Sequence, residues 1–316
     1  MVTDADALLA ASRRPLVIGV GGGGDVVGAL ATAESCRLLH GASSVVGGVT
    51  WERRPIDPRP GPRRISEIEG ARLLAGPVLA AGPDTRVRGD DIRFAESHMA
   101  RFLGEEVVLV DPNPGPAEVA DGLTRAVEAL ACDLLVAVDV GGDALAHGGE
   151  PGLASPLCDA LMLAAAGQVA TETRVPVLGG VFGVGCDGEL TPAEVLERLS
   201  EIAVAGGAAG MRGLTEPVAL RLEAAVAEVP TEASAQAVRA FRGAHGTTTI
   251  RGGRRRVELS LMAAATVYFD VPVALGSAAR LAAAVSGARD LEDANERLNA
   301  LGVRTELDAE REPPPM

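Results

Sequence analysis

The chain has 316 residues, of which 47% are hydrophobic and 23% are charged, a composition typical of a globular protein with a full hydrophobic core. Its formal net charge is −14 and only 2% of its residues are aromatic, whereas a nucleic-acid-binding surface needs basic groups and stacking rings. All 29 basic residues are arginine, which excludes a P-loop lysine and a Schiff-base lysine. We therefore expect no nucleic-acid partner, and any bound anion must be held by arginine, backbone N–H groups or a metal ion.

Cysteine usage and hydropathy indicate the compartment. The four cysteines, at positions 36, 132, 158 and 186, form no C-x-x-C pair, which favours free thiols in a reducing environment. No apolar run approaches the roughly 18 residues of a membrane span. Asp4 and Asp6 occupy positions where a signal peptide would be basic. We expect a soluble, cytoplasmic protein with no membrane partner.

In chain order, apolar runs rich in Val and Leu alternate with helical patterns. The runs that predict strands are 15–20, 43–51, 106–111, 133–139 and 175–184. The helical patterns between them are 26–39, 116–131, 155–170 and 191–205. Strands that are apolar throughout and alternate with helices are typical of a parallel sheet buried on both faces. The pattern predicts an α/β, Rossmann-like fold with a mostly parallel, doubly wound sheet.

The pattern then changes after residue 205. Helices are predicted at 215–228 and 232–241, β-segments at 247–250, 256–262 and 266–271, and two more helices after these. We expect residues 1–205 to form the Rossmann-like core and 206–308 an α+β C-terminal extension packed on it, unless the two make a single domain. Residues 309–316 are expected to be a disordered tail. Within the core, the proline-rich stretch 53–64 predicts a long ordered loop or linker, because repeated prolines exclude a helix.

Glycines and acidic residues gather where the predicted strands end. Gly21, Gly22, Gly23, Gly24 and Asp25 follow the first strand, and later strands are followed by Glu52, Asp111, Asp139, Asp143, Glu150 and Asp187. The carboxyl ends of parallel strands lie along one edge of a sheet, and ligands bind there near the point where the strand order reverses. We therefore predict one pocket at this edge, with the glycine N–H groups available to a phosphate.

The first strand and its glycines also resemble the start of a dinucleotide-binding fold. Glu52 at the end of the second strand, or Arg53 beside it, would then contact the ribose of NAD(P). The G-x-G-x-x-G spacing fits poorly, because counting from Gly21 puts the third glycine position at Val26. Asp25 would compete with a pyrophosphate near the helix N-terminus, whereas a metal ion or a hydroxyl group would suit it. Simple capping of the helix by Asp25 is the alternative.

Two further groups of residues carry chemical hypotheses. Asp143 and Asp187 follow glycine turns, and clustered carboxylates on loops suit Mg²⁺, although each could also be a turn aspartate bonded to its own backbone. Asp187 is a candidate for catalysis as well, and Glu150 is the candidate general base. The segment "IRGGRRR" predicts either a solvent-exposed hairpin turn or an anion clamp made of Arg251 and Arg254.

Seven motifs together resemble one known family. Between about residue 15 and residue 310, the chain contains in order "GGGGDVVGAL", "WERRPIDPRPGP", "DVGGDALAHGGEPGLASPLCDA", "GVGCDGELT", "TEAS", "IRGGRR" and "RTELDAE". This set is similar to the family named domain of unknown function 1152. The resemblance implies a Rossmann-like α/β fold and implies that these loops are shared features. It assigns no catalytic role to any residue.

The residues themselves favour an enzyme that binds a phosphorylated or nucleotide-like small molecule with Mg²⁺ and hydrolyses or transfers a phosphate group. In this hypothesis Asp143 and Asp187 hold the metal, and the four glycines bind the phosphate with Arg251 and Arg254. The first alternative is an NAD(P)-dependent oxidoreductase, and the second is a non-catalytic ligand-binding protein. The sequence does not identify the substrate. It does not fix the oligomeric state either, and a homo-oligomer is one of the alternatives.

Overall fold

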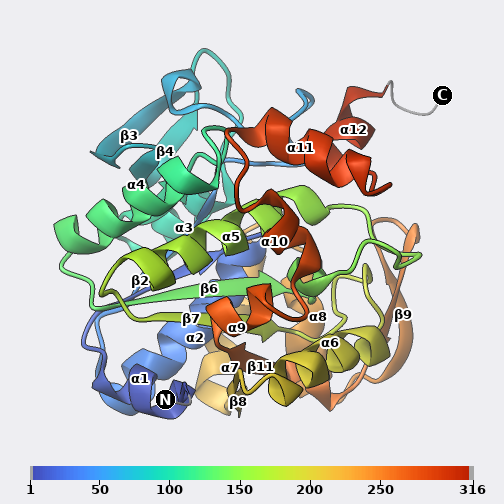
Figure 1. The fold of residues 1–316 in the computed structure, drawn as a ribbon. Helices are drawn as coiled ribbons and strands as arrows, with labels where there is room; N and C mark the ends of the chain where they lie inside the picture. Colours follow the sequence, from blue (N-terminus) through green and yellow to red (C-terminus); the bar gives the residue numbers. More distant parts are fainter. Residues whose placement is uncertain (1–2, 313–316) are drawn as a thin grey trace.

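A nine-stranded sheet, in the order β3-β4-β5-β2-β1-β6-β7-β11-β8, forms the centre of the computed structural model, which describes residues 3–312 (Figure 1). Five neighbouring strands run parallel: β1 (Pro15–Gly19), β2 (Val45–Val49), β5 (Val107–Val110), β6 (Leu134–Val140) and β7 (Val177–Phe182). The chain order of these strands reverses between β1 and β6, so their carboxyl ends form the switch point of a Rossmann-like sheet. The predicted α/β, Rossmann-like fold is confirmed.

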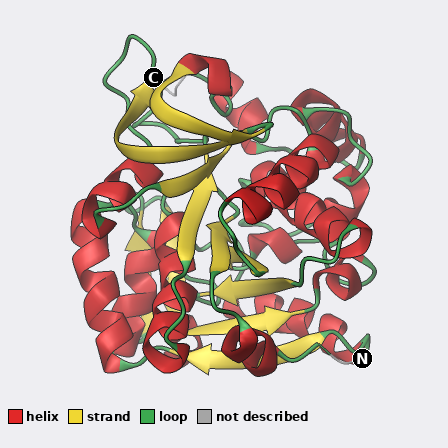
Figure 2. Cartoon of the chain, turned by 90° about the vertical axis from the view of Figure 1, so that its left-hand side faces the viewer, coloured by secondary structure: helices red, strands yellow, loops and turns green. Residues whose placement is uncertain are grey.

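Helices flank the sheet on both sides (Figure 2). One face carries α1 (Ala5–Ala11), α2 (Asp25–His40), α3 (Ala95–Leu103), α7 (Glu216–Glu228) and α8 (Ala233–Phe241). The other carries α4 (Pro116–Ala129), α5 (Pro156–Glu172), α6 (Pro192–Val204), α9 (Val271–Leu275), α10 (Arg280–Val285), α11 (Leu291–Ala300) and α12 (Glu306–Arg311). Side chains of β1 alternate between the two cores, since Leu16 and Ile18 pack with the second group and Val17 with the first. Burial of both faces explains why these strands are apolar throughout.

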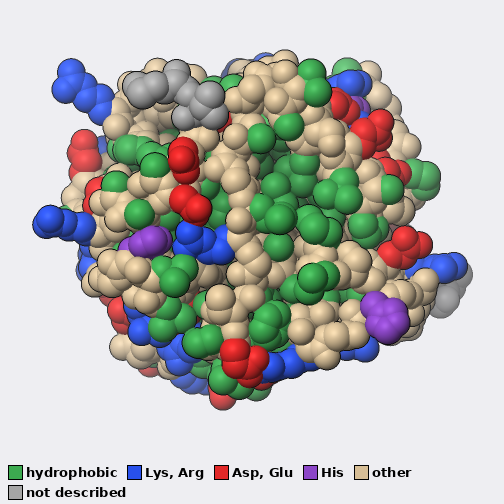
Figure 3. Space-filling model, turned by 90° about the horizontal axis from the view of Figure 1, so that it is seen from below, with side chains coloured by type: hydrophobic (Ala, Val, Ile, Leu, Met, Phe, Trp, Pro, Cys, Tyr) green, Lys and Arg blue, Asp and Glu red, His purple; other side chains and the backbone are tan. Residues whose placement is uncertain are grey.

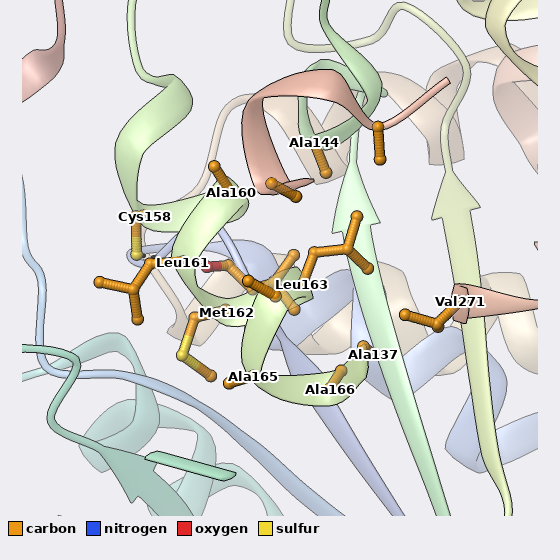
Figure 4. Close-up of a cluster of buried hydrophobic side chains, with 14 of the residues drawn as sticks. Ala137, Ala144, Cys158, Ala160, Leu161, Met162, Leu163, Ala165, Ala166 and Val271 are labelled. Carbon is orange, nitrogen blue, oxygen red and sulfur yellow. Dashed lines mark hydrogen bonds between the residues drawn. The ribbon is translucent and has the colours of Figure 1, made fainter. Parts of the chain in front are cut away.

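Helix α5 is apolar on all sides and lies within the second core. Figure 4 shows its side chains near Ala137 of β6, Ala144 of the short 3₁₀ turn η2 (Asp143–Leu145) and Val271 of α9. A helix with apolar residues all round is stable only when it is enclosed in this way. Asp159, in its first turn, is the one charged residue between Pro156 and Gln168. The packing of α5 therefore fixes the position of this carboxylate.

Antiparallel strands complete both ends of the sheet. One end has β4 (Val78–Val87) and β3 (Ile68–Ala75), and the other has β11 (Ala265–Phe269) and β8 (Ala208–Gly213). The sequence pattern did not predict β3, β4, β8, α1 or α3, because elements exposed on one side lack the continuous apolar runs of the parallel strands. Since β8 and β11 join the central sheet, residues 206–308 extend the same sheet. The remaining strands, β9 (Gly246–Ile250) and β10 (Arg255–Leu259), pair as a separate hairpin.

Four short helices, α9 to α12, end the described part of the chain, where two were predicted. Helix α12 reaches Arg311, so residues 309–311 of the expected disordered tail are helical, which corrects that expectation. A capping box formed by Thr305 and Asp308 starts this helix, and Leu307 anchors it in the core. Residues 313–316 lie outside the described residues. The stretch 53–64 is free of regular helix, as expected, and a buried ion pair between Asp57 and Arg63 holds it.

The strand β8 forms one outer edge of the sheet, toward the bottom of Figure 1. Figure 3 shows that apolar side chains gather on the face seen from below. Met211 on β8 is 58% exposed and Val204 at the end of α6 is 90% exposed. Edge strands and exposed apolar patches serve as interfaces between protein chains. This surface is therefore suited to the predicted homo-oligomer, which stays a prediction. Within residues 3–312, none of the helices combines the length and the apolar composition that a membrane crossing needs.

Candidate functional site

A cavity of about 720 Å³ opens at the carboxyl edge of the parallel strands, beside the switch point between β1 and β6. Its walls come from the loops after β1, β2 and β7, from the start of α5 and from the β9–β10 hairpin. Segments far apart in the sequence therefore meet around one space. Open α/β sheets bind their ligands at this position.

The glycines after β1 form the floor of the cavity and are required there for different reasons. Gly22 and Gly23 have φ angles of +80° and +54°, which favour glycine. A Cβ on Gly21 would lie 2.7 Å from Asp25 Oδ2 and 2.9 Å from Asp159 Oδ1, and one on Gly24 would overlap Thr231. Among the described residues, the N–H groups of Gly22 and Gly24 have no hydrogen-bond partner. Two backbone donors are therefore available to a ligand at the start of α2.

Six carboxylates surround this floor in two groups of three. The first group is Asp25, Asp139 and Asp159, and the second is Asp143, Asp187 and Glu189. Each carboxylate contributes one oxygen to its group, and the three oxygens of a group lie within 4.8 Å of one another. Apart from Asp25, all of these residues are at least nine-tenths buried. Such spacing is suited to divalent cations, which take oxygen ligands.

Most of these carboxylates favour their neutral form in the absence of a cation. Burial raises the pKa of Asp25 to about 7 and that of Asp187 to about 8. Burial, together with the neighbouring carboxylates, raises the pKa values of Asp139, Asp143 and Asp159 well above the usual range. The cluster therefore attracts protons or metal ions.

Glu189 behaves differently because it has its own partners. Burial raises its pKa, but the Arg255 guanidinium, 2.6 Å away, and hydrogen bonds from Ser155 and Ala154 outweigh burial and hold the pKa below its usual value. Glu189 is therefore ionised. It is the member of the second group that is already paired with a cationic side chain.

Three carboxylate oxygens in the two groups are buried and have no hydrogen-bond partner in the part of the chain that the structure describes: Asp139 Oδ1, Asp159 Oδ1 and Asp187 Oδ1. Buried polar atoms are nearly always hydrogen-bonded, so unpaired ones need an explanation. The second oxygen of Asp139 accepts from the Ala144 N–H at 3.2 Å, and that of Asp187 accepts from the Glu189 N–H at 3.2 Å. In both residues the backbone orients the carboxylate and leaves the other oxygen free.

Arginines surround the carboxylates without neutralising most of them. The Arg53 side chain stacks 4.3 Å above the Trp51 ring and donates to Gly21 O at 3.0 Å and to Glu306 Oε1 at 3.2 Å. Arg251 and Arg254 line the cavity from the hairpin, are exposed, and form no ion pair among the described residues. Arg251 also has a φ of 53°, which bends the hairpin at this point. The two hairpin arginines are therefore free to meet an anion.

Glu52 lines the cavity but one of its oxygens has a structural role. Its Oε1 accepts the Ala95 N–H at 2.6 Å, at the start of α3. Burial raises its pKa to about 7. Behind it lies Glu96, whose two side-chain oxygens are buried and unpaired. A Cβ on Gly48 would lie 1.9 Å from Glu96 Oε1, so a glycine is needed there to admit this carboxyl group.

The cavity brings together most of the residues that the sequence placed in one pocket. Those that line it are Gly21, Gly22, Gly23, Gly24, Asp25, Glu52, Asp143, Asp187, Arg251 and Arg254. Asp25 does not cap its helix, since Gly24 is the N-cap residue and the Asp25 carboxylate accepts the Gly21 N–H at 3.0 Å.

Three residues that the sequence placed at this edge, Asp111, Asp139 and Glu150, are not among those that line the cavity, and the hydrogen bonds of Asp111 and Glu150 correct the expectations for these two. Asp111 accepts N–H groups of Ile65 and Asn113, each at 2.9 Å, and so fixes the loop after β5. Glu150 accepts the N–H groups of His147 and Gly148, each at 2.8 Å, and closes its own turn. Both carboxylates are engaged by the backbone, which is the usual role of acidic residues in turns. Glu150 is therefore not retained as the general base.

Several lining residues were not among the predicted site residues. Asp159, Glu189 and Arg255 contribute side chains to the cavity. Asp139, which the sequence did place at this edge, lies in β6 with an oxygen within 4.8 Å of oxygens of Asp25 and Asp159. The sequence does carry a signal for Asp159, because a lone acidic residue in an otherwise apolar helix needs a buried partner. Glu189 lies two residues after Asp187 in the same loop. Its ion pair with Arg255 joins segments that are far apart in the chain, and the sequence does not reveal such a contact.

Comparison with known proteins adds a family. A family model described as "Protein of unknown function (DUF1152)" matches residues 16–313. No curated protein matches the chain, and no solved structure does.

Proposed function

The chain belongs to the DUF1152 family, and we propose that its cavity binds a phosphorylated small molecule together with Mg²⁺ and that the protein hydrolyses or transfers a phosphate group. The observation that supports this most is the Asp187 carboxylate, whose Oδ1 is buried and unpaired beside Asp143 and Glu189. A buried carboxylate oxygen without a proton donor is stabilised by a cation.

The rest of the cavity suits the phosphate. The N–H groups of Gly22 and Gly24 lie at the start of α2, where the helix dipole favours negative charge. Arg251 and Arg254 face the cavity without competing ion pairs, so they can neutralise phosphate oxygens. A bound Mg²⁺ would polarise a phosphoryl oxygen and lower the pKa of a coordinated water. Donors on one side and a cation on the other suit displacement at phosphorus.

NAD(P)-dependent oxidoreduction is a second candidate because the parallel strands have the order of a dinucleotide-binding sheet. The carboxylates count against it. Asp25 and Asp159 flank Gly21, close to where the pyrophosphate would bind, and would repel it. In addition, Glu52 already uses one oxygen on the Ala95 N–H. We therefore favour the metal–phosphate function.

The proposal includes a cytoplasmic location, which the chemistry of the cysteines supports. All four are free thiols, and Cys36, Cys158 and Cys186 are buried. Proteins of reducing compartments keep their cysteines in this state.

The function is tested by thermal stability and by phosphate release. Metal-free protein is heated with nucleotides and sugar phosphates, each with and without Mg²⁺, and the same mixtures are assayed for free phosphate. We expect stabilisation that needs both components, and its loss in Asp143→Asn. The control is Asp121→Asn, which changes an exposed aspartate on α4. Ligand binding without turnover would show a binding protein, and stabilisation by NAD(P) without metal would favour the oxidoreductase.

A further inference from the structure

The first carboxylate group, Asp25, Asp139 and Asp159, comes from different elements than the group assigned to Mg²⁺ above and adjoins it, because the side chain of Asp139 meets that of Asp143. Asp25 begins α2, Asp139 lies in β6 and Asp159 lies in the first turn of α5. These three elements are part of the buried centre of the fold, so their relative positions are fixed by packing. One oxygen from each carboxylate lies within 4.8 Å of the others.

Two oxygens in this group accept no hydrogen bond from an N–H or hydroxyl group within residues 3–312. These are Asp139 Oδ1 and Asp159 Oδ1, and both residues are only 2% exposed. The position of Gly21 shows where Asp159 Oδ1 points. A Cβ on Gly21 would stand 2.9 Å from that oxygen and 2.7 Å from Asp25 Oδ2, so both atoms face the same small space. Asp25 Oδ2 accepts one N–H, from Gly21, whereas Asp159 Oδ1 accepts none, and Asp139 supplies a further oxygen within 4.8 Å of an oxygen of each of these residues. Carboxylate oxygens that converge with so few donors indicate a cation between them.

Among the described residues, no side chain forms a hydrogen bond or an ion pair that neutralises these carboxylates, although the Arg53 charge partly offsets the charges of Asp25 and Asp159. Arg53 is the nearest candidate, but its hydrogen bonds go to Gly21 O and Glu306, and Arg255 is paired with Glu189. Within residues 3–312, none of the three aspartates takes part in an ion pair. The chain also contains no lysine. The missing charge must therefore come from a bound ion or from protons.

We propose that a second divalent cation binds between Asp25, Asp139 and Asp159, next to the one at Asp143, Asp187 and Glu189. Asp139 is close enough to Asp187, and Asp143 to Asp159, for their charges to interact directly. Two neighbouring divalent cations clamp the attacking and leaving oxygens of an in-line displacement at phosphorus. The substrate class is then a phosphate ester or anhydride whose oxygens contact both ions. This catalytic use rests on the proposed function, whereas the binding of the second ion does not.

Manganese(II) is the probe, because it takes the same oxygen ligands as Mg²⁺ and gives an electron paramagnetic resonance signal. Metal-free full-length protein is titrated with Mn²⁺ by calorimetry, and the spectrum is recorded at saturation. We expect two ions per chain and a spin-coupled spectrum for the native protein. Asp159→Asn should bind one ion and show the uncoupled spectrum of an isolated Mn²⁺. Asp121→Asn should bind two, as the native protein does.

The outcomes separate this inference from the proposed function. One ion in the native protein, lost in Asp187→Asn and kept in Asp159→Asn, would overturn the second site and leave the first intact. Two ions in Asp159→Asn would also overturn it. No bound Mn²⁺ in any variant would overturn both proposals and show that protons neutralise the cluster. Should Asp159→Asn fail to fold by circular dichroism, Asp25→Asn provides the same readout at the less buried member of the group.

Discussion

Gly21 and Asp159 are 138 positions apart in the chain, yet a Cβ placed on Gly21 would lie 2.9 Å from Asp159 Oδ1. The glycine therefore provides the space in which the first carboxylate group meets. Gly23, two residues further along the chain, is constrained by its backbone and not by space. A Cβ there would meet no atom within 4 Å, but its φ is +54°. One glycine is required by a close approach and the other by its backbone conformation.

This difference predicts distinct effects for two alanine substitutions. Gly21→Ala should lower Mn²⁺ affinity by roughly tenfold or more, because the methyl group would displace Asp25 and Asp159. Gly23→Ala should leave Mn²⁺ affinity unchanged and lower the free energy of unfolding by ~1–2 kcal/mol through backbone strain. Calorimetric titration and urea unfolding measure the two quantities. Equal loss of metal affinity in both variants would contradict this assignment of the two glycines.

The buried carboxylates predict that Asp143→Asn stabilises the metal-free protein. Burial and the neighbouring carboxylates raise the pKa of Asp143, so its charged form is unfavourable in the folded state. An uncharged amide of similar size removes this repulsion, and we expect the melting temperature at pH 8 to rise by roughly 2–5 °C. With saturating Mg²⁺ the order should reverse, because only the native protein gains the full binding energy. A variant that melts below the native protein without metal would show that Asp143 is a structural turn residue.

Glu52 predicts a pH dependence of stability outside the metal ligands. Burial raises its pKa from 4.5 to about 7, so the folded state holds a proton that the unfolded chain loses. The stabilisation by this proton is fully present below pH 4.5 and is lost as the pH rises through about 7. The shift corresponds to about 3 kcal/mol once both states are ionised.

Glu52→Gln tests this linkage directly. The glutamine carbonyl can still accept the Ala95 N–H, but it does not titrate. The stability of the variant relative to the native protein should therefore increase between pH 5 and pH 8. Melting temperatures recorded across this range provide the measurement. A constant difference between the two proteins would mean that Glu52 is already ionised at pH 5.

The parallel core was predictable because its strands are buried on both faces, and continuous apolar runs such as residues 107–110 reveal such burial locally. The strand β3 has one exposed face, so its mixed sequence gave no comparable signal. The order of the strands in the sheet depends on contacts between distant segments. The periodicity of apolar residues carries information only about local structure, so it does not predict this order.

The candidate site shows a similar limit. Asp143 and Glu150 occur in the same glycine-rich loop, and both are acidic residues beside glycines. Asp143 lines the cavity, whereas Glu150 turns back to the His147 and Gly148 N–H groups. The direction of a carboxylate depends on which donors the folded loop offers. Asp159 was missed for another reason, since it comes from a helix and the prediction considered only strand ends.

The β9–β10 hairpin allows the phosphate side of the cavity to be tested separately from the metal side. Arg251 and Arg254 line the cavity, whereas Arg256, on the same hairpin, is exposed and does not. Arg251→Asn is the suitable change because asparagine tolerates the φ of 53° at this position. Arg254→Gln removes the charge of the second residue and keeps a polar side chain.

The double variant should bind pyrophosphate, with Mg²⁺ present, 10- to 100-fold more weakly, on the order of one tenfold loss for each charge-assisted contact. Mn²⁺ affinity should not fall, because neither arginine forms an ion pair with the carboxylates and the Arg251 charge, which acts on Asp187, opposes a bound cation. The melting temperature should stay unchanged, since both side chains are exposed. Arg256→Gln serves as the matched control and should bind pyrophosphate as the native protein does. Calorimetry gives both affinities on the same samples. An equal loss of pyrophosphate affinity in the control would show that the hairpin acts only through its overall charge. An unchanged affinity in the double variant would show that Arg251 and Arg254 do not bind the phosphate.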